Sequence, residues 1–292
     1  MKLTVSSYST ALFATWHFIE EWGLLLDAGD GLMASLHQKS RKVKNVLISH
    51  ADRDHITGLL QFVQLNSRKD FPKIYHPKDS GSFPFLAEFS EKFDPHIEPA
   101  TWIGINETNV IPLGKRMMAK PVKNNHVLKN NPIAKSFGYI IQKKKRKLKD
   151  AYKHLSNKEI AKISREKGQD EITKVLTENV LGYSGDTPPE NFEQWNNTQT
   201  LIHESTFLNV HDTPEFEKEH RRHSTVEEVL YHTSQLNIER LILSHFSLRY
   251  SHEQIDETIQ KYCKEFQVKF PVYRILPGVF HKDILSGEAV NV

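Results

Sequence analysis

The chain has 292 residues, of which 38% are hydrophobic and 26% are charged, as in a globular protein with a sizeable core. Its length fits one large α/β domain, and its net charge of +3 neither requires nor excludes a polyanionic partner. The single cysteine, Cys263, excludes an intramolecular disulfide and a cysteine-built zinc site.

No segment predicts an association with a membrane. The N-terminal residues Met1 to Ser7 lack the apolar stretch of a secretory signal. No later run approaches the ~20 apolar residues of a membrane span. We therefore expect a cytoplasmic protein without a membrane partner.

The first half of the chain alternates predicted strands and helices. Two strands, joined by a tight turn at residues 21–23, are followed by a helix, a third strand, a helix with one apolar face, a fourth strand and a further segment of the same pattern. The ranges in that order are 11–20, 22–28, 32–40, 43–49, 56–66, 73–76 and 84–93.

The second half repeats this alternation. Strands are predicted at 137–142, 180–184, 200–203 and 240–244, and helices at 224–237 and 251–266. Each helix opens with a capping-box pattern, Ser224 with Glu227 and Ser251 with Gln254. Cys263 lies on the apolar face of the second helix, so we interpret it as a core residue. Alternating strands and helices favour sheets flanked by helices over a helical bundle or an all-β sandwich.

Polar blocks follow several of the predicted strands. The first, residues 50–55, holds His50, Asp52, Asp54 and His55 where a strand gives way to a helix. A loop there can turn several ligands onto one point, as a hydrolytic metal centre needs. A polar turn is the simpler interpretation, so the case depends on later blocks. These contain His126, Asp186, His203 with Glu204, His223 and His245, in that order.

With these blocks the chain resembles the metallo-β-lactamase superfamily. Within it, the chain is similar to the ribonuclease Z branch, endonucleases that trim the 3′ trailer from precursor tRNA. The resemblance runs from about residue 3 to 280 and includes the His-Glu-Ser-Thr block at 203–206 and the His-Ser-Thr block at 223–225. Glycine-rich or cysteine-containing blocks of lactamase-like relatives are absent. The resemblance implies a four-layer αββα sandwich, with residues 1–292 as a single domain.

The resemblance also implies two metal ions that share one bridging carboxylate. The implied ligands are Asp54, His55, Asp186 and His245 at one metal, and His50, Asp52, His126 and Asp186 at the other. From the residues alone, Asp186 could instead cap a helix, His245 could be a satisfied core histidine, and His126 could be a surface residue. We expect two Zn²⁺ ions per chain.

Asp52 departs from the family motif His-x-His-x-Asp-His, which has a histidine at this position. A carboxylate ligates zinc at a similar bond length, but it has a shorter reach and adds negative charge. The exchange should favour a harder cation such as Mn²⁺. If Asp52 does not reach, one site would be weak or empty.

The resemblance assigns the catalytic roles as well. Asp54 would ligate a metal and orient, or accept a proton from, the attacking water. Glu204 and His223 match a relay that protonates the leaving 3′ oxygen. A helix N-terminus beside His223 disfavours its imidazolium, and a nearby Glu204 carboxylate would restore it. A plain surface histidine is the alternative, and His220 is a competing candidate. Arg249 and Tyr250 either contact phosphate or pack the ligand loop.

An insert at 143–179 separates two of the predicted strands. It begins with a basic run that includes Lys143, Lys144 and Lys145, and we predict helices at 151–167 and 170–178. A solvated surface and an RNA-backbone contact are both compatible with such a run. The insert lacks the Gly-Pro-rich arm of bacterial family members, which puts recognition of the tRNA elbow in doubt.

The leading hypothesis is a metal-dependent phosphodiesterase that acts on precursor tRNA as an endoribonuclease. We expect RNA as the partner and a homodimer, as is usual in the resembling family. One alternative is a phosphodiesterase for a cyclic nucleotide or another small phosphodiester. A non-catalytic metal- or RNA-binding relative is the other.

Overall fold

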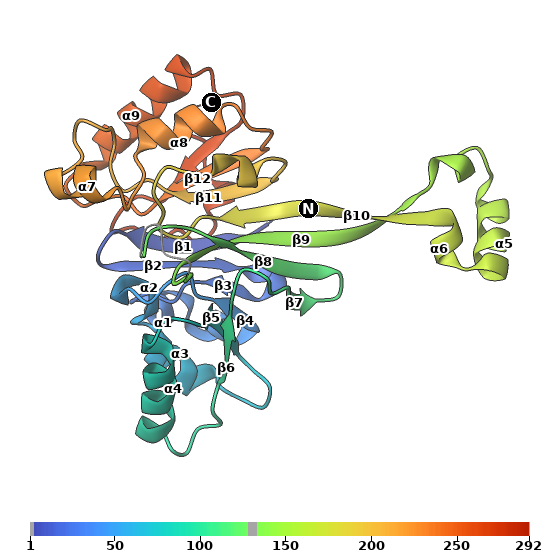
Figure 1. The fold of residues 1–292 in the computed structure, drawn as a ribbon, viewed down its shortest axis with the longest axis horizontal. Coiled ribbons are helices and arrows are strands. Elements are labelled where there is room, and N and C mark those ends of the chain that lie inside the picture. The colour runs from blue at the N-terminus through green and yellow to red at the C-terminus, as the bar shows by residue number, and fades with distance from the viewer. Residues whose placement is uncertain (1–2, 128–132, 292) are drawn as a thin grey trace.

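Two β-sheets packed face to face form the centre of the computed structural model, which describes residues 3–127 and 133–291 (Figure 1). The first sheet has its six strands in chain order: β1 (Val5–Thr10), β2 (Ala14–Ile19), β3 (Leu24–Leu26), β4 (Asn45–Leu47), β5 (Lys73–Pro77) and β6 (Thr101–Ile105). The second has the order β13-β12-β11-β10-β9-β8-β7: β7 (Ile111–Gly114), β8 (Met117–Lys123), β9 (Phe137–Leu148), β10 (Thr173–Tyr183), β11 (Thr200–Glu204), β12 (Arg240–Ser244) and β13 (Val272–Arg274).

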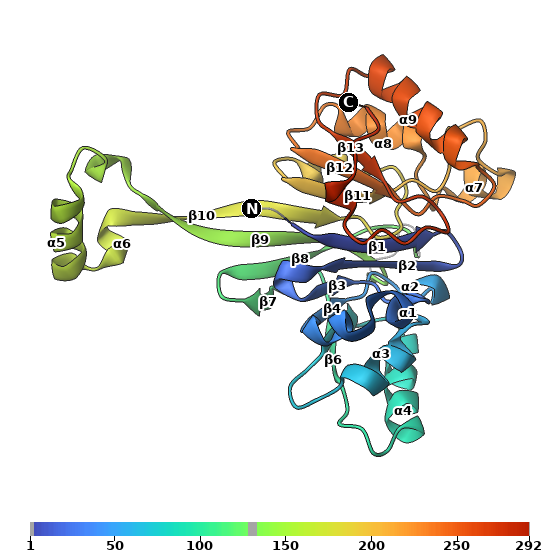
Figure 2. The ribbon, with the colours of Figure 1, turned by 180° about the vertical axis from the view of Figure 1, so that it is seen from behind.

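Helices cover the outer face of each sheet, as Figures 1 and 2 show from opposite sides. Those beside the first sheet are α1 (Leu32–Leu36), α2 (Arg53–Ile56), α3 (Leu59–Asn66) and α4 (Ser82–Phe93). Those beside the second are α7 (Glu215–His220), α8 (Val226–Thr233) and α9 (His252–Glu265). Short 3-10 helices are η1 (Glu20–Trp22), η2 (His37–Lys42), η3 (Asp150–Tyr152), η4 (Phe192–Trp195) and η5 (Ile284–Ser286). The predicted four-layer αββα sandwich is confirmed.

Side-chain alternation along the central strands explains the layers. In β3, Leu24 and Leu26 enter the core between the two sheets, whereas Leu25 packs beneath the helices of the first layer. In β12, Ile242 faces the core between the sheets, and Leu241 and Leu243 pack against α8 and α9. Strands buried on both faces read as continuous apolar runs, which is why the sequence shows no alternating polarity here.

Parallel pairing brings the polar blocks to one edge of the sandwich. Strands β3 to β6 pair in parallel, and so do β10 to β13. Parallel strands end on the same side, and ligands of such sheets bind in the crevice beyond their carboxyl ends. The blocks at 50–55, 186 and 245 follow β4, β10 and β12, and Glu204 is the last residue of β11, so the topology alone gathers them.

The insert is a two-stranded arm, and its prediction as a helical segment is partly wrong. Strands β9 and β10 continue past the sheet as an antiparallel pair, and α5 (Asn157–Lys167) and α6 (Gln169–Ile172) lie at the far end (Figures 1 and 2). The predicted helix at 170–178 breaks at Ile172, because Thr173 to Glu178 pair residue by residue with Lys143 to Leu148. The predicted helix at 151–167 begins only after the Ser156 cap.

Other predicted boundaries shift by a few residues. The capping box of α8 is formed by Thr225 and Glu228, one residue after the predicted pair, whereas that of α9 is Ser251 with Gln254 as predicted. Cys263 is buried on the inner face of α9, as expected. Within residues 3–127 and 133–291, no helix combines the length and apolar character needed to cross a bilayer.

Candidate metal centre

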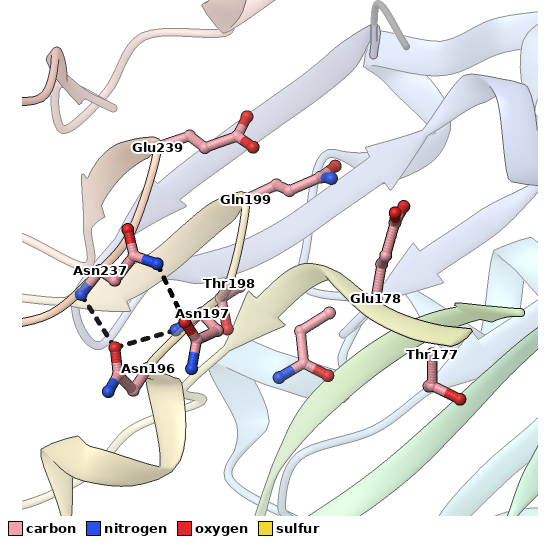
Figure 3. Close-up of a pocket in the computed structure, with 9 residues that line it drawn as sticks. Thr177, Glu178, Asn196, Asn197, Thr198, Gln199, Asn237 and Glu239 are labelled. Atoms are coloured by element: carbon pink, nitrogen blue, oxygen red, sulfur yellow. Dashed lines mark hydrogen bonds between the residues drawn. The ribbon is translucent and has the colours of Figure 1, made fainter. Parts of the chain in front are cut away.

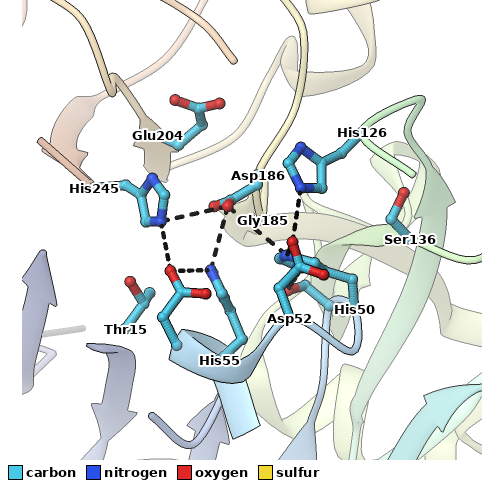
Figure 4. A network of polar contacts seen from close by, with 12 residues as sticks. Thr15, His50, Asp52, His55, His126, Ser136, Gly185, Asp186, Glu204 and His245 are labelled. Atoms are coloured by element: carbon cyan, nitrogen blue, oxygen red, sulfur yellow. Dashed lines mark hydrogen bonds and ion pairs between the residues drawn. The ribbon is translucent and has the colours of Figure 1, made fainter. Parts of the chain in front are cut away.

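All seven predicted ligands converge at one end of the sandwich (Figure 4). Their donor atoms form two groups, and within each group they lie within 4.8 Å of one another. The groups are Asp54, His55, Asp186 and His245, and His50, Asp52 and His126. Each group draws on loops far apart in the sequence, so the convergence is a property of the fold and not of the first motif alone.

The first group surrounds the Asp186 carboxylate. Its Oδ2 lies 3.3 Å from Nε2 of both His55 and His245. The Oδ2 of Asp54 lies 3.5 Å from the same atom of His55 and 3.3 Å from that of His245. Two carboxylates and two imidazoles around one point make a donor set suited to a divalent transition metal.

Asp52 closes the second group. Its Oδ2 lies 3.5 Å from Nε2 of both His50 and His126. Oδ2 of Asp186 lies 3.8 Å from the same atom of His50, which places one carboxylate between the two groups. The shorter side chain therefore reaches the position where the family motif has a histidine. It remains 58% exposed and makes no capping hydrogen bond to α2.

The four histidines are held in one orientation by hydrogen bonds at Nδ1. His55 donates to Asp27 at 2.7 Å, and His50 donates to the Ser49 hydroxyl at 2.8 Å. His126 donates to a backbone carbonyl at 3.1 Å, and the Nδ1 of His245 lies 2.9 Å from the Thr206 hydroxyl. This pattern leaves each Nε2 facing the carboxylates of the centre, the orientation that metal-binding histidines have.

Two buried nitrogen atoms support a bound cation. Nε2 of His50 and of His55 is buried and has no hydrogen-bond partner in the part of the chain that the structure describes. A buried polar atom without a partner is costly unless something binds it. Because both atoms point to the carboxylates, the residues present fit metal ions.

Asp27 is a functional residue that the sequence interpretation missed. Its fully buried carboxylate accepts hydrogen bonds from His55, from the Ser49 backbone and hydroxyl at 2.7 Å each, and from the Tyr183 hydroxyl. It thereby orients His55 directly and His50 through Ser49. The available signal was an aspartate that ends the apolar run Leu24 to Leu26, in a left-handed backbone conformation with φ 54°.

The carboxylates of the centre are held in the ionised form. Burial opposes a charge on Asp186, but His245 and His55 keep its pKa well below the usual range. Burial likewise opposes a charge on Asp54, and a hydrogen bond from His245 lowers its pKa. For Asp52, the hydrogen bond with His126 and the nearby His50 imidazole lower the pKa. Ionised carboxylates are the form that binds a cation.

Glu204 and His223 form a pair against the same centre. Nδ1 of His223 lies 3.1 Å from Glu204 Oε1, and Thr206 donates to the other carboxylate oxygen at 2.9 Å. The His223 ring lies between those of His126 and His245, with centroids 4.8 and 5.5 Å away. Burial disfavours the imidazolium, but the Glu204 charge outweighs it and raises the pKa of His223. The predicted pairing is thus present in the structure.

The predicted substrate-contacting residues lie in different surroundings. Tyr250 is buried in the core beneath α9, which favours packing over phosphate contact. The Arg249 guanidinium lies over the Phe207 ring, 5.3 Å from its centroid. Lys143, Lys144 and Lys145 start the arm, six or more residues along β9 from Phe137. At ~3.3 Å per residue they lie roughly 20 Å or more from that end of the strand.

A polar cavity of about 480 Å³ lies near the amino ends of β11 and β12 (Figure 3). Its asparagines bind one another: the Asn237 amide donates to Asn197 at 2.9 Å, and its backbone donates to Asn196 at 2.9 Å. Its lining holds no histidine, and these hydrogen bonds account for its shape. We assign the chemistry to the metal centre.

Sequence comparisons agree with the resemblance inferred from the polar blocks. The chain is 29% identical to the chloroplastic tRNase Z of Arabidopsis thaliana over 77% of this chain, and it covers 64% of that protein. It is 26% identical to the ribonuclease Z of Pyrococcus horikoshii, over 90% of this chain and 87% of that protein. No family model matches the chain.

Structural comparisons identify the fold. The metallo-β-lactamase fold protein YhfI of Bacillus subtilis superposes with a TM-score of 0.64 at 16% identity, covering 96% of this chain and all of that one. The short form of human tRNase Z superposes with a TM-score of 0.55 at 18% identity, covering 86% and 94%. The chain therefore has the metallo-β-lactamase fold, and its curated relatives are ribonucleases Z, as predicted.

Proposed function

We propose that this ribonuclease Z-like chain is a metal-dependent phosphodiesterase that cleaves precursor tRNA at its 3′ end. The observation that carries the proposal is the placement of the Glu204–His223 pair against two ligand groups that share Asp186. A scaffold that only bound metal would have no need of a buried acid–base pair at this point. The sequence relatives, named tRNase Z or ribonuclease Z, support the substrate class.

The proposal includes two Zn²⁺ ions per chain, with Mn²⁺ as the alternative at the Asp52 group. The seven side chains of the two groups would hold them, with Asp186 between the two. When bound, such a pair supplies a nucleophilic water near neutral pH and offsets the charge on the phosphoryl oxygens. A carboxylate in place of the histidine makes the Asp52 group harder and more negative than in the family motif.

Asp54 is the proposed base. A hydrogen bond of 3.2 Å from the backbone N–H of Leu12 fixes its Oδ2 from outside the centre. The donor lies in the β1–β2 turn with φ 70°, a conformation that a leucine rarely adopts. The turn thus holds the carboxylate where it can orient the attacking water and accept its proton.

His223 is the proposed acid. Its Nδ1–H faces Glu204, so the other ring nitrogen is free to carry the proton to the leaving 3′ oxygen. Glu204 is fixed in turn by backbone N–H groups of Thr187 and Ser224, at 3.1 Å each. The backbone N–H and the hydroxyl of Thr206 also donate to it, so the fixed carboxylate keeps the imidazolium in one orientation and stabilises its charge.

The arm is the proposed RNA-binding element. Residues 143–178 contain twelve Lys and Arg against six Asp and Glu, a net charge of +6 in a chain whose total is +3. The body is therefore slightly acidic, and the positive charge is concentrated on the arm. Lys144 and Lys145 are exposed near its base. Clustered cations at this distance from the centre suit a large polyanion and have no role for a small diester.

Two further elements of the proposal concern assembly and location. We propose a homodimer, on the basis of the family resemblance alone, and a cytoplasmic protein, as expected from the sequence. Sedimentation of the metal-loaded protein tests the first, and the position of a tagged chain in its own cell tests the second.

Cleavage of a precursor tRNA with a 3′ trailer tests the activity, compared with bis(p-nitrophenyl) phosphate as a small activated diester. We expect saturable, site-specific cleavage of the RNA by the wild type. In Asp54→Ala the cleavage rate should fall by more than about a hundredfold. Asp30→Ala, which changes an exposed aspartate in the turn between β3 and α1, is the matched control. Turnover of the small diester without any cleavage of RNA would favour the alternative, a phosphodiesterase for a small substrate.

A further inference from the structure

A second cavity opens beside the metal centre, on the side of Asp52. It has a volume of about 430 Å³, within the ~300–1,000 Å³ range of ligand pockets. Besides Asp52, its lining includes Ser80, Gly81 and Ser82 before and at the start of α4, together with Phe85 and Lys135. No residue of this wall other than Asp52 takes part in the chemistry proposed above.

One wall of this cavity offers donors for an anion. The α4 N-terminus follows Gly81 and has no side-chain cap, so its first N–H groups keep their partial positive charge. Ser80 as a residue is only 6% exposed, its hydroxyl is not among the fully buried polar atoms, and it forms no hydrogen bond in the described part of the chain. A hydroxyl that is accessible from a cavity and has no protein partner is free to donate a hydrogen bond to a ligand.

Lys135 adds a full charge to this wall, and it forms no ion pair with any residue that the structure describes. Its ammonium, the Ser80 hydroxyl and the helix N-terminus together suit a phosphate group.

The rim of the cavity carries an exposed aromatic ring. Phe85 lies one turn into α4 and is 73% exposed. An exposed phenylalanine beside an anion site suits stacking with a nucleic-acid base, which is worth ~1–3 kcal/mol per base in single-stranded binding. A double-stranded segment has no free base face to offer this ring. The exposed ring beside donors for a phosphate therefore favours a single strand.

We infer that this cavity binds the nucleotide next to the cleaved phosphodiester in a single-stranded stretch of RNA. Its phosphate lies against Lys135, Ser80 and the α4 N-terminus, and its base stacks on Phe85. The inference rests on the proposed function, because it places that nucleotide beside the Asp52 side of the same centre.

Binding of short oligonucleotides to the intact, metal-loaded protein tests the inference directly. The probes are a fluorescently labelled cytidine tetranucleotide with a non-hydrolysable backbone and an abasic tetramer of the same charge. Phe85→Ala should weaken the binding of tetracytidylate at least about fivefold and the binding of the abasic tetramer by less. Lys135→Ala should weaken the binding of both probes. It should also lower the slope of log affinity against log salt concentration by about one.

Phe89→Ala is the matched control, because this phenylalanine is also exposed, stands one turn further along α4 and does not line the cavity. It should bind both probes as the wild type does. The inference would be overturned if the Phe85 and Phe89 variants lost affinity equally, or if Phe85→Ala bound tetracytidylate as the wild type does. It would also be overturned if the wild type did not bind tetracytidylate.

Activity separates this inference from the proposed function. If the wild type cleaves precursor tRNA and Phe85→Ala cleaves it with an unchanged kcat/KM, the cavity is not a nucleotide site although the function stands. If the wild type cleaves no RNA, the proposed function fails. The oligonucleotide measurements then still decide whether the cavity binds a single strand.

Discussion

Asp27 illustrates how a residue that touches no metal can control a metal centre. Its carboxylate lies at the junction of two chains of hydrogen bonds, one to His55 and one through Ser49 to His50, so each ligand group depends on it. Outer partners of this type fix the tautomer and the orientation of the ligating ring. Hydrogen bonds to an ionised group also carry more energy than neutral ones.

We predict that Asp27→Asn weakens metal binding by about 10- to 100-fold while the protein stays folded. The asparagine amide has only one acceptor oxygen, and its NH2 group would bring donors towards His55. Competition with a chromophoric chelator measures the affinity, and circular dichroism checks the fold. Asp30→Asn, at an exposed position three residues away, should change neither quantity; an Asp27→Asn protein with wild-type affinity would contradict this role.

The Glu204–His223 pair gives a pH dependence with a definite sign. A general acid must be protonated, and burial lowers the pKa of His223 whereas the Glu204 carboxylate raises it above the ordinary value near 6.5. Activity that needs this proton therefore persists above pH 6.5 and falls as the pH rises through the raised pKa. Glu204→Gln removes the charge but not the burial, so the falling limb should move to lower pH.

The pH profile of kcat for precursor tRNA tests this prediction, with bis(p-nitrophenyl) phosphate as the comparison. A p-nitrophenolate leaving group needs little protonation, so its profile should shift much less. If the falling limb for RNA stayed in place in Glu204→Gln, the pair would not be the proton donor.

At the scale of secondary structure, the polar blocks could be predicted because each follows a buried strand. The apolar run before His50 and the run before His245 are β4 and β12, and the family order of the blocks supplied the ligand set. Asp27 escaped notice because it belongs to no polar block. Its role depends on long-range hydrogen bonds to Ser49, His55 and Tyr183, which no local pattern encodes.

The arm could not be predicted correctly from local pattern. Residues 173–178 carry lysine, leucine and glutamate, which suit a helix, yet they form β10 because β9 offers a partner strand across the hairpin. Pairing of this kind overrides intrinsic propensity. The missed strands β6, β7 and β8 are short or half-exposed, and β13 has only three residues. The prediction also missed β1, a buried strand whose sequence Val5 to Thr10 is rich in serine and threonine.

For the arm we predict that the double variant Lys144→Ala, Lys147→Ala raises KM for precursor tRNA. It should also lower the slope of log affinity against log salt concentration by about two. Both side chains are exposed and form no ion pair in the described structure, so folding should be unaffected. Filter binding at several salt concentrations measures the slope. The control pair Lys264→Ala and Lys269→Ala, exposed on and after α9, should leave it unchanged. An unaltered slope in the arm variant would show that the arm does not contact the RNA.

At the scale of the whole molecule, the centre joins loops from both sheets. Ligands come from the loops of β4 in the first sheet and of β8, β10 and β12 in the second. A cation that binds both sets stabilises the packing of one sheet on the other, because the unfolded chain cannot assemble the site. Without it, three carboxylates lie close together and repel one another.

Removal of metal should therefore lower the melting temperature. Free metal at a hundredfold excess over Kd stabilises the native state by about 2.7 kcal/mol, which corresponds to a shift of roughly 5–10 °C. Differential scanning calorimetry with and without a chelator measures it. Asp186→Ala should melt at the same temperature with and without the chelator. If the melting temperature of the wild type also did not change with the chelator, a metal that bridges the sheets would be contradicted.

The pleat of the β9–β10 arm allows its length to change in defined steps. Inserting two residues into each strand would move the helical tip outwards by roughly 7 Å and leave every side chain on its present face, whereas a single residue would exchange the faces. The reach between the tip and the centre can thus change in steps without redesign of the contact surface. If the arm binds RNA as proposed, a change in this one hairpin would adapt the protein to substrates of different length.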